Sequence, residues 1–120
     1  MGFNRFGPAF AVAAAVVMAA SAVSAHARLV SSTPLANATV AAPRSIVLSF
    51  SERMVPAFSS FDVVNAAGAK AVLGTSVSED GRSITGALAR PLAAGGYTVN
   101  WRIASSDGHR MTGSYAFTVR

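Results

Sequence analysis

Apolar and polar residues alternate with a period of two near the end of this chain. In the clearest run the apolar or aromatic residues are Tyr97, Val99, Trp101 and Ile103, and polar residues stand between them (Thr98, Asn100, Arg102). A second run alternates in the same way (Tyr115, Phe117, Val119 against Ser114, Ala116, Thr118). Successive side chains of a β-strand point to opposite faces of the sheet, so each run predicts a strand with one buried face.

Weaker signals of the same kind precede these two runs. Alternation continues through residues 46–50, and Phe61 and Val63 start another run. Residues 72–77 form a looser segment broken by Gly74, and Ile84 and Leu88 follow a turn. Leu29-Val30 lies shortly before Pro34, which favours a strand at a sheet edge. Turn-forming residues separate the runs at 66–68, 79–81 and 91–96. No segment after residue 25 keeps a helical period. About seven short strands at this spacing predict an all-β fold, an antiparallel sandwich or small barrel.

Residues 1–25 differ from the rest of the chain. The segment carries one charge, Arg5, and residues 8–25 are apolar or small throughout. We interpret it as a signal helix that is removed on export. The alternative is a membrane anchor, because the run approaches the roughly 18 apolar residues that such a segment needs. Its richness in alanine and the small residues at its end favour the signal peptide.

Two cleavage sites fit the small-x-small pattern equally well. Val23-Ser24-Ala25 would leave His26 as the first residue, and Ala25-His26-Ala27 would leave Arg28. The first cut gives a single domain of residues 26–120 in the periplasm. Such a length buries about 60–70% of the surface that its unfolded chain exposes, so the core is modest.

The chain contains no cysteine. Disulfides, thiolate ligands and a blue-copper centre, which needs a cysteine, are therefore excluded. Basic residues exceed acidic ones by ten to five, but they are scattered singly along the chain. No basic stripe with interleaved aromatic residues is present, so nucleic acid is not an expected partner.

The chain has two histidines, and each lies beside further metal-binding groups. If cleavage follows Ala25, His26 offers a free α-amine together with its imidazole. His109 ends the motif Asp107-Gly108-His109, which falls between the two best predicted strands and so in a loop at one end of the domain. Three nitrogens and a carboxylate oxygen form a set that favours Cu(II) over Zn(II). Glu52, at the end of the run 46–50, is a further candidate ligand.

Each of these residues also has an ordinary structural interpretation. Asp-Gly is a common turn dipeptide, a loop histidine is usually solvated, and Glu52 could be a solvated strand end. The aromatic residues are expected in the core (Phe50, Phe61, Tyr97, Trp101, Tyr115, Phe117). No Ser/His/Asp arrangement has local support, so no nucleophile is predicted.

Several sequence blocks resemble the CopC family of periplasmic copper-binding proteins. They are His26-Ala27-Arg28-Leu29, Ser32-Thr33-Pro34, Phe50-Ser51-Glu52, a long block over 91–102, Ser105-Ser106-Asp107-Gly108-His109, and a final block over 113–119. The resemblance implies a Greek-key β-barrel or sandwich related to cupredoxins and immunoglobulin-like domains. It implies a Cu(II) site formed by His26, through amine and ring, with Asp107 and His109, and it implicates Glu52. It also favours cleavage before His26.

The sequence departs from one pattern of that family, a methionine-rich loop with a histidine that binds Cu(I). Residues 66–80 contain neither methionine nor histidine. Because thioether sulfur is what selects Cu(I), the chain is expected to bind Cu(II) only, one ion per chain. We therefore expect a monomeric, non-enzymatic periplasmic protein of copper homeostasis or resistance. It would sequester copper or deliver it to a partner such as an inner-membrane copper-transport protein, without stable membrane insertion. The alternatives are a copper-dependent oxidative enzyme with an N-terminal histidine site, and a structural β-sandwich that binds no metal.

Overall fold

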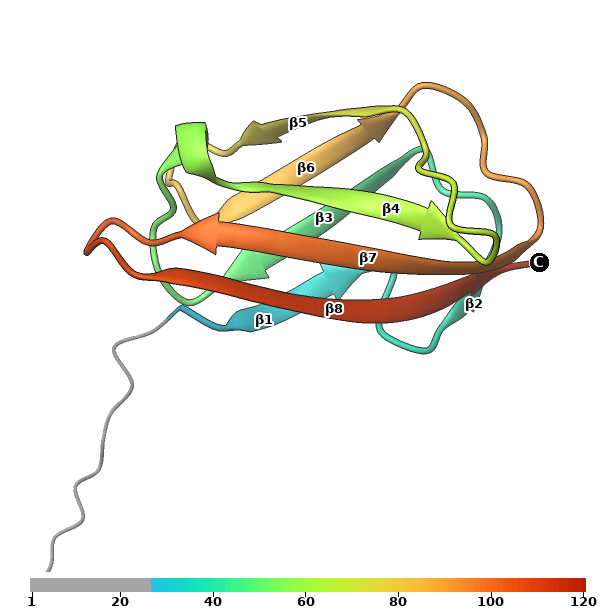
Figure 1. Cartoon of the computed structure of the whole chain (residues 1–120), viewed down its shortest axis with the longest axis horizontal. Helices are drawn as coiled ribbons and strands as arrows, with labels where there is room; N and C mark the ends of the chain where they lie inside the picture. Colours follow the sequence, from blue (N-terminus) through green and yellow to red (C-terminus); the bar gives the residue numbers. More distant parts are fainter. Residues whose placement is uncertain (1–26) are drawn as a thin grey trace, which may run out of the picture.

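The computed structural model describes residues 27–120 as two packed β-sheets. One sheet has the order β1-β3-β6-β5, formed by Leu29–Thr33, Ser45–Phe50, Ser83–Leu88 and Leu73–Val77. The other has the order β2-β8-β7-β4, formed by Thr39–Val40, Arg110–Val119, Gly95–Ala104 and Ser60–Asn65. A short 3₁₀ helix, η1 (Pro56–Phe58), precedes β4 (Figure 1). The all-β prediction is confirmed for this part of the chain.

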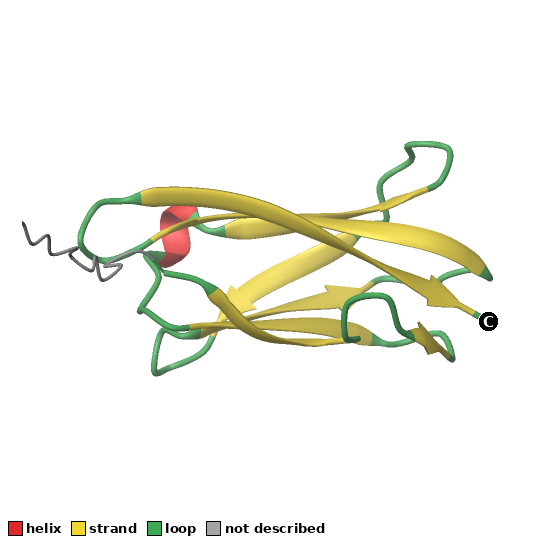
Figure 2. Cartoon of the chain, turned by 90° about the horizontal axis from the view of Figure 1, so that it is seen from below, coloured by secondary structure: helices red, strands yellow, loops and turns green. Residues whose placement is uncertain are grey.

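Two details of the predicted fold class need correction. The sheets form two separate layers, so the fold is a sandwich and not a closed barrel (Figure 2). The structure also contains β2, which the sequence did not predict and which pairs in parallel with the end of β8. A two-residue strand is too short to show any alternation. The predicted signal helix of residues 1–25 lies outside the described residues and stays a prediction.

The predicted alternation corresponds to burial in the strands. In β3 the residues Ile46, Leu48 and Phe50 are buried and their neighbours are half-buried. In β7 the side chains of Tyr97, Val99 and Ile103 are buried. The inner faces of both sheets thus supply one continuous hydrophobic core. All six aromatic residues expected in the core are buried or packed against it.

Trp101 packs between the two sheets. Its ring meets that of Phe50 edge to face, with 5.0 Å between the ring centroids. Trp101 is paired with Gly113 on the neighbouring strand β8. A β-carbon at Gly113 would overlap Cζ2 of Trp101, so the indole occupies the space that a side chain would need.

We expect Gly113→Ala to lower the free energy of unfolding by about 1–3 kcal/mol, the usual cost of forcing extra volume into a packed core. Urea denaturation measures this value. Gly74→Ala in β5 is the matched control, because its β-carbon would have no neighbour within 4 Å. That change should be neutral or slightly stabilising, since alanine restricts the unfolded chain. Equal losses for the two variants would contradict the packing role of Gly113.

The strands run lengthwise, so the sandwich has two ends (Figure 1). The loop between β7 and β8, the helix η1 and the turn between β5 and β6 lie at one end, where β1 also begins. We call this the loop end. The connections between β4 and β5 and between β6 and β7 lie at the opposite end.

Candidate metal centre

The loop between β7 and β8 is a compact turn of residues 105–109. Its base is closed by the last pair of the strand ladder, Ala104 with Arg110. Within the loop the backbone N–H of Ser105 donates to the carbonyl of His109 at 2.8 Å, and the N–H of Gly108 donates to the carbonyl of Ser105 at 2.9 Å. Gly108 has a φ of 96°, a conformation that glycine adopts without strain. The loop at one end of the sandwich confirms the placement predicted for Asp107-Gly108-His109.

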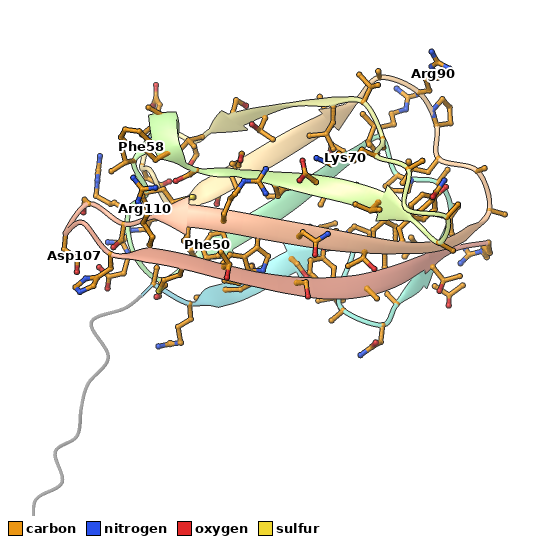
Figure 3. All side chains as sticks on the ribbon, viewed as in Figure 1. Phe50, Phe58, Lys70, Arg90, Asp107 and Arg110 are labelled. Carbon is orange, nitrogen blue, oxygen red and sulfur yellow. The ribbon has the colours of Figure 1, made fainter. Side chains whose placement is uncertain are left out.

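The loop brings Asp107 and His109 together at one carboxylate oxygen. The Oδ1 atom of Asp107 accepts hydrogen bonds from the hydroxyl of Ser105 and, at 3.1 Å, from the backbone N–H of His109. The imidazole Nδ1 of His109 lies 3.0 Å from the same oxygen. Both side chains stay accessible, with 44% of Asp107 and 52% of His109 exposed, and Figure 3 shows Asp107 at the tip of the loop.

These contacts keep the Asp107 carboxylate ionised. The hydrogen bond from Ser105 is the main cause that lowers the pKa of Asp107 well below its usual range, and the backbone N–H and the side chain of His109 lower it further. All three donors stabilise the charged form of the carboxylate. The loop therefore presents a permanent negative charge beside an imidazole.

The spacing of the two side chains matches that of two neighbouring ligands on one metal ion. Donors bound at about 2.0–2.1 Å and at a right angle to each other lie about 2.9 Å apart, and Cu(II) prefers such tetragonal geometry with nitrogen and oxygen ligands. The observed separation between Oδ1 of Asp107 and Nδ1 of His109 is 3.0 Å. The loop thus holds an oxygen and a nitrogen donor at the edge length of a square copper site.

Glu52 lies close to this loop in the fold but outside the pair. It is half-buried in the bend that follows β3. The neighbouring Arg53 carbonyl accepts a hydrogen bond from the N–H of Ser106 at 3.0 Å, and Met54 forms a bridge with Ser105. Across residues 27–120, however, no three side chains of the His, Cys, Asp or Glu type gather at one point. The structure therefore does not unite Glu52 with Asp107 and His109 in one ligand group.

His26 lies outside the described residues, but the chain immediately after it is placed at the loop end. Ala27 is buried in the core, with 4% of its surface exposed. The N–H of Arg28 donates to the hydroxyl of Ser51 at 2.9 Å, and the N–H of Ser51 donates to the carbonyl of Arg28 at 3.0 Å. The described chain thus begins beside the bend 51–54, which itself contacts the loop 105–109.

Two features of the loop end were missed from the sequence. Ser105 comes two residues after Ile103, in the same alternating series of inward-facing residues as Trp101 and Ile103, and only 1% of its surface is exposed. A buried serine needs a hydrogen-bond partner, and this requirement could have identified Ser105 from the sequence. Phe58 is 59% exposed, and the guanidinium of Arg110 lies 5.4 Å from its ring centroid. Figure 3 shows Phe58 and Arg110 close together near the loop.

Residues 27–120 include no helix of sufficient length and hydrophobicity to span a membrane.

Comparison with known proteins places the chain among copper resistance proteins. A family model described as "CopC domain" matches residues 29–120. The chain is 35% identical to "Copper resistance protein C" of Xanthomonas campestris pv. juglandis, over 91% of this chain and 95% of the relative. It is 38% identical to the Escherichia coli protein of the same name, over 88% and 90% of the two chains.

Solved structures agree with the sequence comparisons. The crystal structure of PcoC from Escherichia coli, titled "a Methionine Rich Copper Resistance Protein", superposes with a TM-score of 0.74 at 38% identity and covers 80% of this chain and 100% of that one. The structure of CopC from Methylosinus trichosporium OB3b gives 0.73 at 38% identity, covering 78% and 93%. The chain therefore belongs to the CopC family.

Proposed function

We propose that this protein binds one Cu(II) ion per chain in the periplasm, through the amine and imidazole of His26 together with Asp107 and His109. It would serve copper resistance by holding copper or delivering it to a partner such as an inner-membrane copper-transport protein. Copper binding in copper resistance is the function that its family supports. The observation that carries the site is the 3.0 Å separation between Oδ1 of Asp107 and Nδ1 of His109.

The loop already holds two metal-binding donors close together. In the metal-free protein a proton can lie between the carboxylate of Asp107 and the imidazole of His109. A metal ion would replace that proton once the ring and the carboxylate turn toward it, because donors 3.0 Å apart leave no room for the ion on the line between them. The ionised carboxylate contributes one negative charge toward the divalent ion, so the charge of the bound copper is partly offset. Two neighbouring positions would remain for the amine and ring of His26.

Glu52 is assigned a supporting role outside the ligand set. It lies in the bend 51–54 that contacts both the start of the described chain and the loop. Its carboxylate adds negative charge at the loop end, which favours a bound cation at short range. It is not grouped with the two loop donors.

The ligand set favours Cu(II) over Cu(I). The PcoC relative is described as methionine rich. This chain has four methionines, and the two in the part of the chain that the structure describes both pack in the core. Met54 is buried, with 4% of its surface exposed, and Met111 is partly buried against the core. Nitrogen and oxygen donors suit Cu(II), whereas Cu(I) prefers thioether or thiolate sulfur. We therefore expect no tight Cu(I) site in this protein.

The loop end supports binding more than catalysis. An oxidative enzyme that acts on a polymer would need an open copper position and an exposed aromatic platform. Among residues 27–120 the large exposed hydrophobic side chains include a single aromatic one, Phe58, and Arg110 covers one face of its ring. The relatives, too, are named copper resistance proteins.

The binding proposal predicts that Cu(II) quenches the emission of Trp101, the only tryptophan. Trp101 lies three residues before the end of β7, so about 10 Å of strand separates it from the base of the loop 105–109. Quenching should be complete at one equivalent of Cu(II), and Zn(II), which has no unpaired electron, should leave the emission unchanged. A fluorescence titration measures both.

Acidification provides the control for this titration. Protons compete with copper for imidazole and amine nitrogens, because each must be deprotonated to bind the ion. The affinity should fall steadily from about pH 8 to pH 5. Asp107 does not contribute to this fall, because its lowered pKa keeps it ionised across the range. Quenching that needs many equivalents, or that survives replacement of both histidines, would show that copper binds elsewhere.

A further inference from the structure

Ser105 is the most deeply buried polar residue of the loop end. Only 1% of its surface is exposed, and it comes directly after the end of β7, two residues beyond the buried Ile103. Its hydroxyl donates to Oδ1 of Asp107 and also lies 3.3 Å from the carbonyl oxygen of His109. A single buried side chain thus contacts both of the residues proposed to bind copper from this loop.

The hydrogen bonds to Asp107 would respond differently to metal binding. The imidazole Nδ1 of His109 would turn to the metal as a ligand and would then no longer donate to the carboxylate. The hydroxyl of Ser105 and the backbone N–H of His109 would remain as the donors that fix the Asp107 carboxylate. Of these two, Ser105 is the one that comes from a side chain and can be removed by substitution.

We propose that Ser105 is a positioning residue, which holds the carboxylate of Asp107 in the orientation that binds copper. This inference rests on the proposed function of the loop and assigns a further residue to it. Groups that hydrogen-bond to a metal ligand orient it, and their loss typically lowers metal affinity by about 10–100-fold. The hydroxyl of Ser105 meets that description for Asp107.

The positioning role is separable from the role of Ser105 in the turn. Its backbone N–H and carbonyl close the turn with His109 and Gly108, and these bonds do not involve the side chain. Replacement of Ser105 by alanine therefore removes the two hydroxyl contacts and leaves the backbone contacts available. The loop should persist with a less constrained Asp107.

Ser105→Ala is expected to lower the Cu(II) affinity by about 10–100-fold, measured by competition with a chelator of known affinity. It should also alter the copper hyperfine splitting in electron paramagnetic resonance, because an oxygen ligand moves. Ser59→Ala is the matched control. Ser59 is likewise buried at the loop end, but its hydroxyl bonds to Val55 and Ala104 and not to Asp107. Its loss should leave the copper affinity within about twofold, well below the effect expected for Ser105.

A double-mutant cycle with Asp107→Ala separates positioning from general damage to the fold. If Ser105 acts through Asp107, removal of its hydroxyl has no further effect once the carboxylate is absent. Equal losses in both backgrounds would overturn the proposal. If Ser105→Ala does not fold, Ser105→Thr and Ser105→Val provide the same comparison, since they share a shape and differ in the hydroxyl. Thr should then bind copper more tightly than Val.

The metal-free protein supplies a readout that is independent of copper. The backbone amide of His109 donates to the oxygen that Ser105 holds, so its NMR resonance should shift in Ser105→Ala and not in Ser59→Ala. An unchanged copper affinity in Ser105→Ala, with large losses in Asp107→Ala and His109→Ala, would refute the role of Ser105 alone. Unchanged affinity in all three variants would refute the proposed copper site itself.

Discussion

A single residue added in front of His26 should lower the Cu(II) affinity by at least about a hundredfold. The addition converts the primary amine of His26 to an amide, which removes one nitrogen donor and breaks the chelate with the ring. Loss of a group that merely supports a ligand already costs about 10–100-fold, so loss of a ligand should cost more. Competition titration of the two forms measures the difference.

The control is the same extended protein after a protease has removed the extra residue, which should restore full affinity. The mass of the exported protein completes this test. A start at Arg28 would mean that both nitrogens of His26 are lost during maturation. An unchanged affinity in the extended form would show that the amine is not a ligand.

Replacement of His109 by alanine should also reduce Cu(II) affinity by at least about a hundredfold, because an imidazole donor is lost outright. Glu52→Ala should reduce it by less than about tenfold, since that residue is placed outside the ligand pair. The same chelator competition measures both variants.

Thermal unfolding of the metal-free variants provides the control. His109 is exposed and Glu52 is half-buried outside the core cluster, so neither change should unfold the domain. A loss for Glu52→Ala as large as that for His109→Ala would make Glu52 a direct ligand.

The sequence predicted the long hairpin of β7 and β8 because alternation reports burial on one face directly. It predicted the start of β8 less accurately, since Gly113 interrupts the series of apolar residues that face the core. The structure explains this interruption, because the indole of Trp101 fills the space beside Gly113. Alternation could not distinguish a sandwich from a barrel, because it shows which face of a strand is buried but not whether the sheet closes.

The sequence also predicted part of the candidate site. Asp107 and His109 were expected in one loop at an end of the domain, and the structure places their donor atoms 3.0 Å apart. The burial of Ser105 could have been inferred from the alternation of β7, but its bond to Asp107 depends on the turn that Gly108 permits, which a residue pattern does not reveal. Glu52 was proposed from its place after a strand, and only the fold shows that it is not grouped with the loop pair.

The burial of Ala27 and the pairing of Arg28 with Ser51 fix the beginning of the described chain at the loop end. If His26 becomes the first residue on export, its free α-amine, and with it the chelate of amine and ring, forms only when one peptide bond is cut. The precursor would carry the imidazole of His26 with Asp107 and His109, but not the amine that completes the proposed ligand set. Processing, and not synthesis, would then determine when the full ligand set is complete.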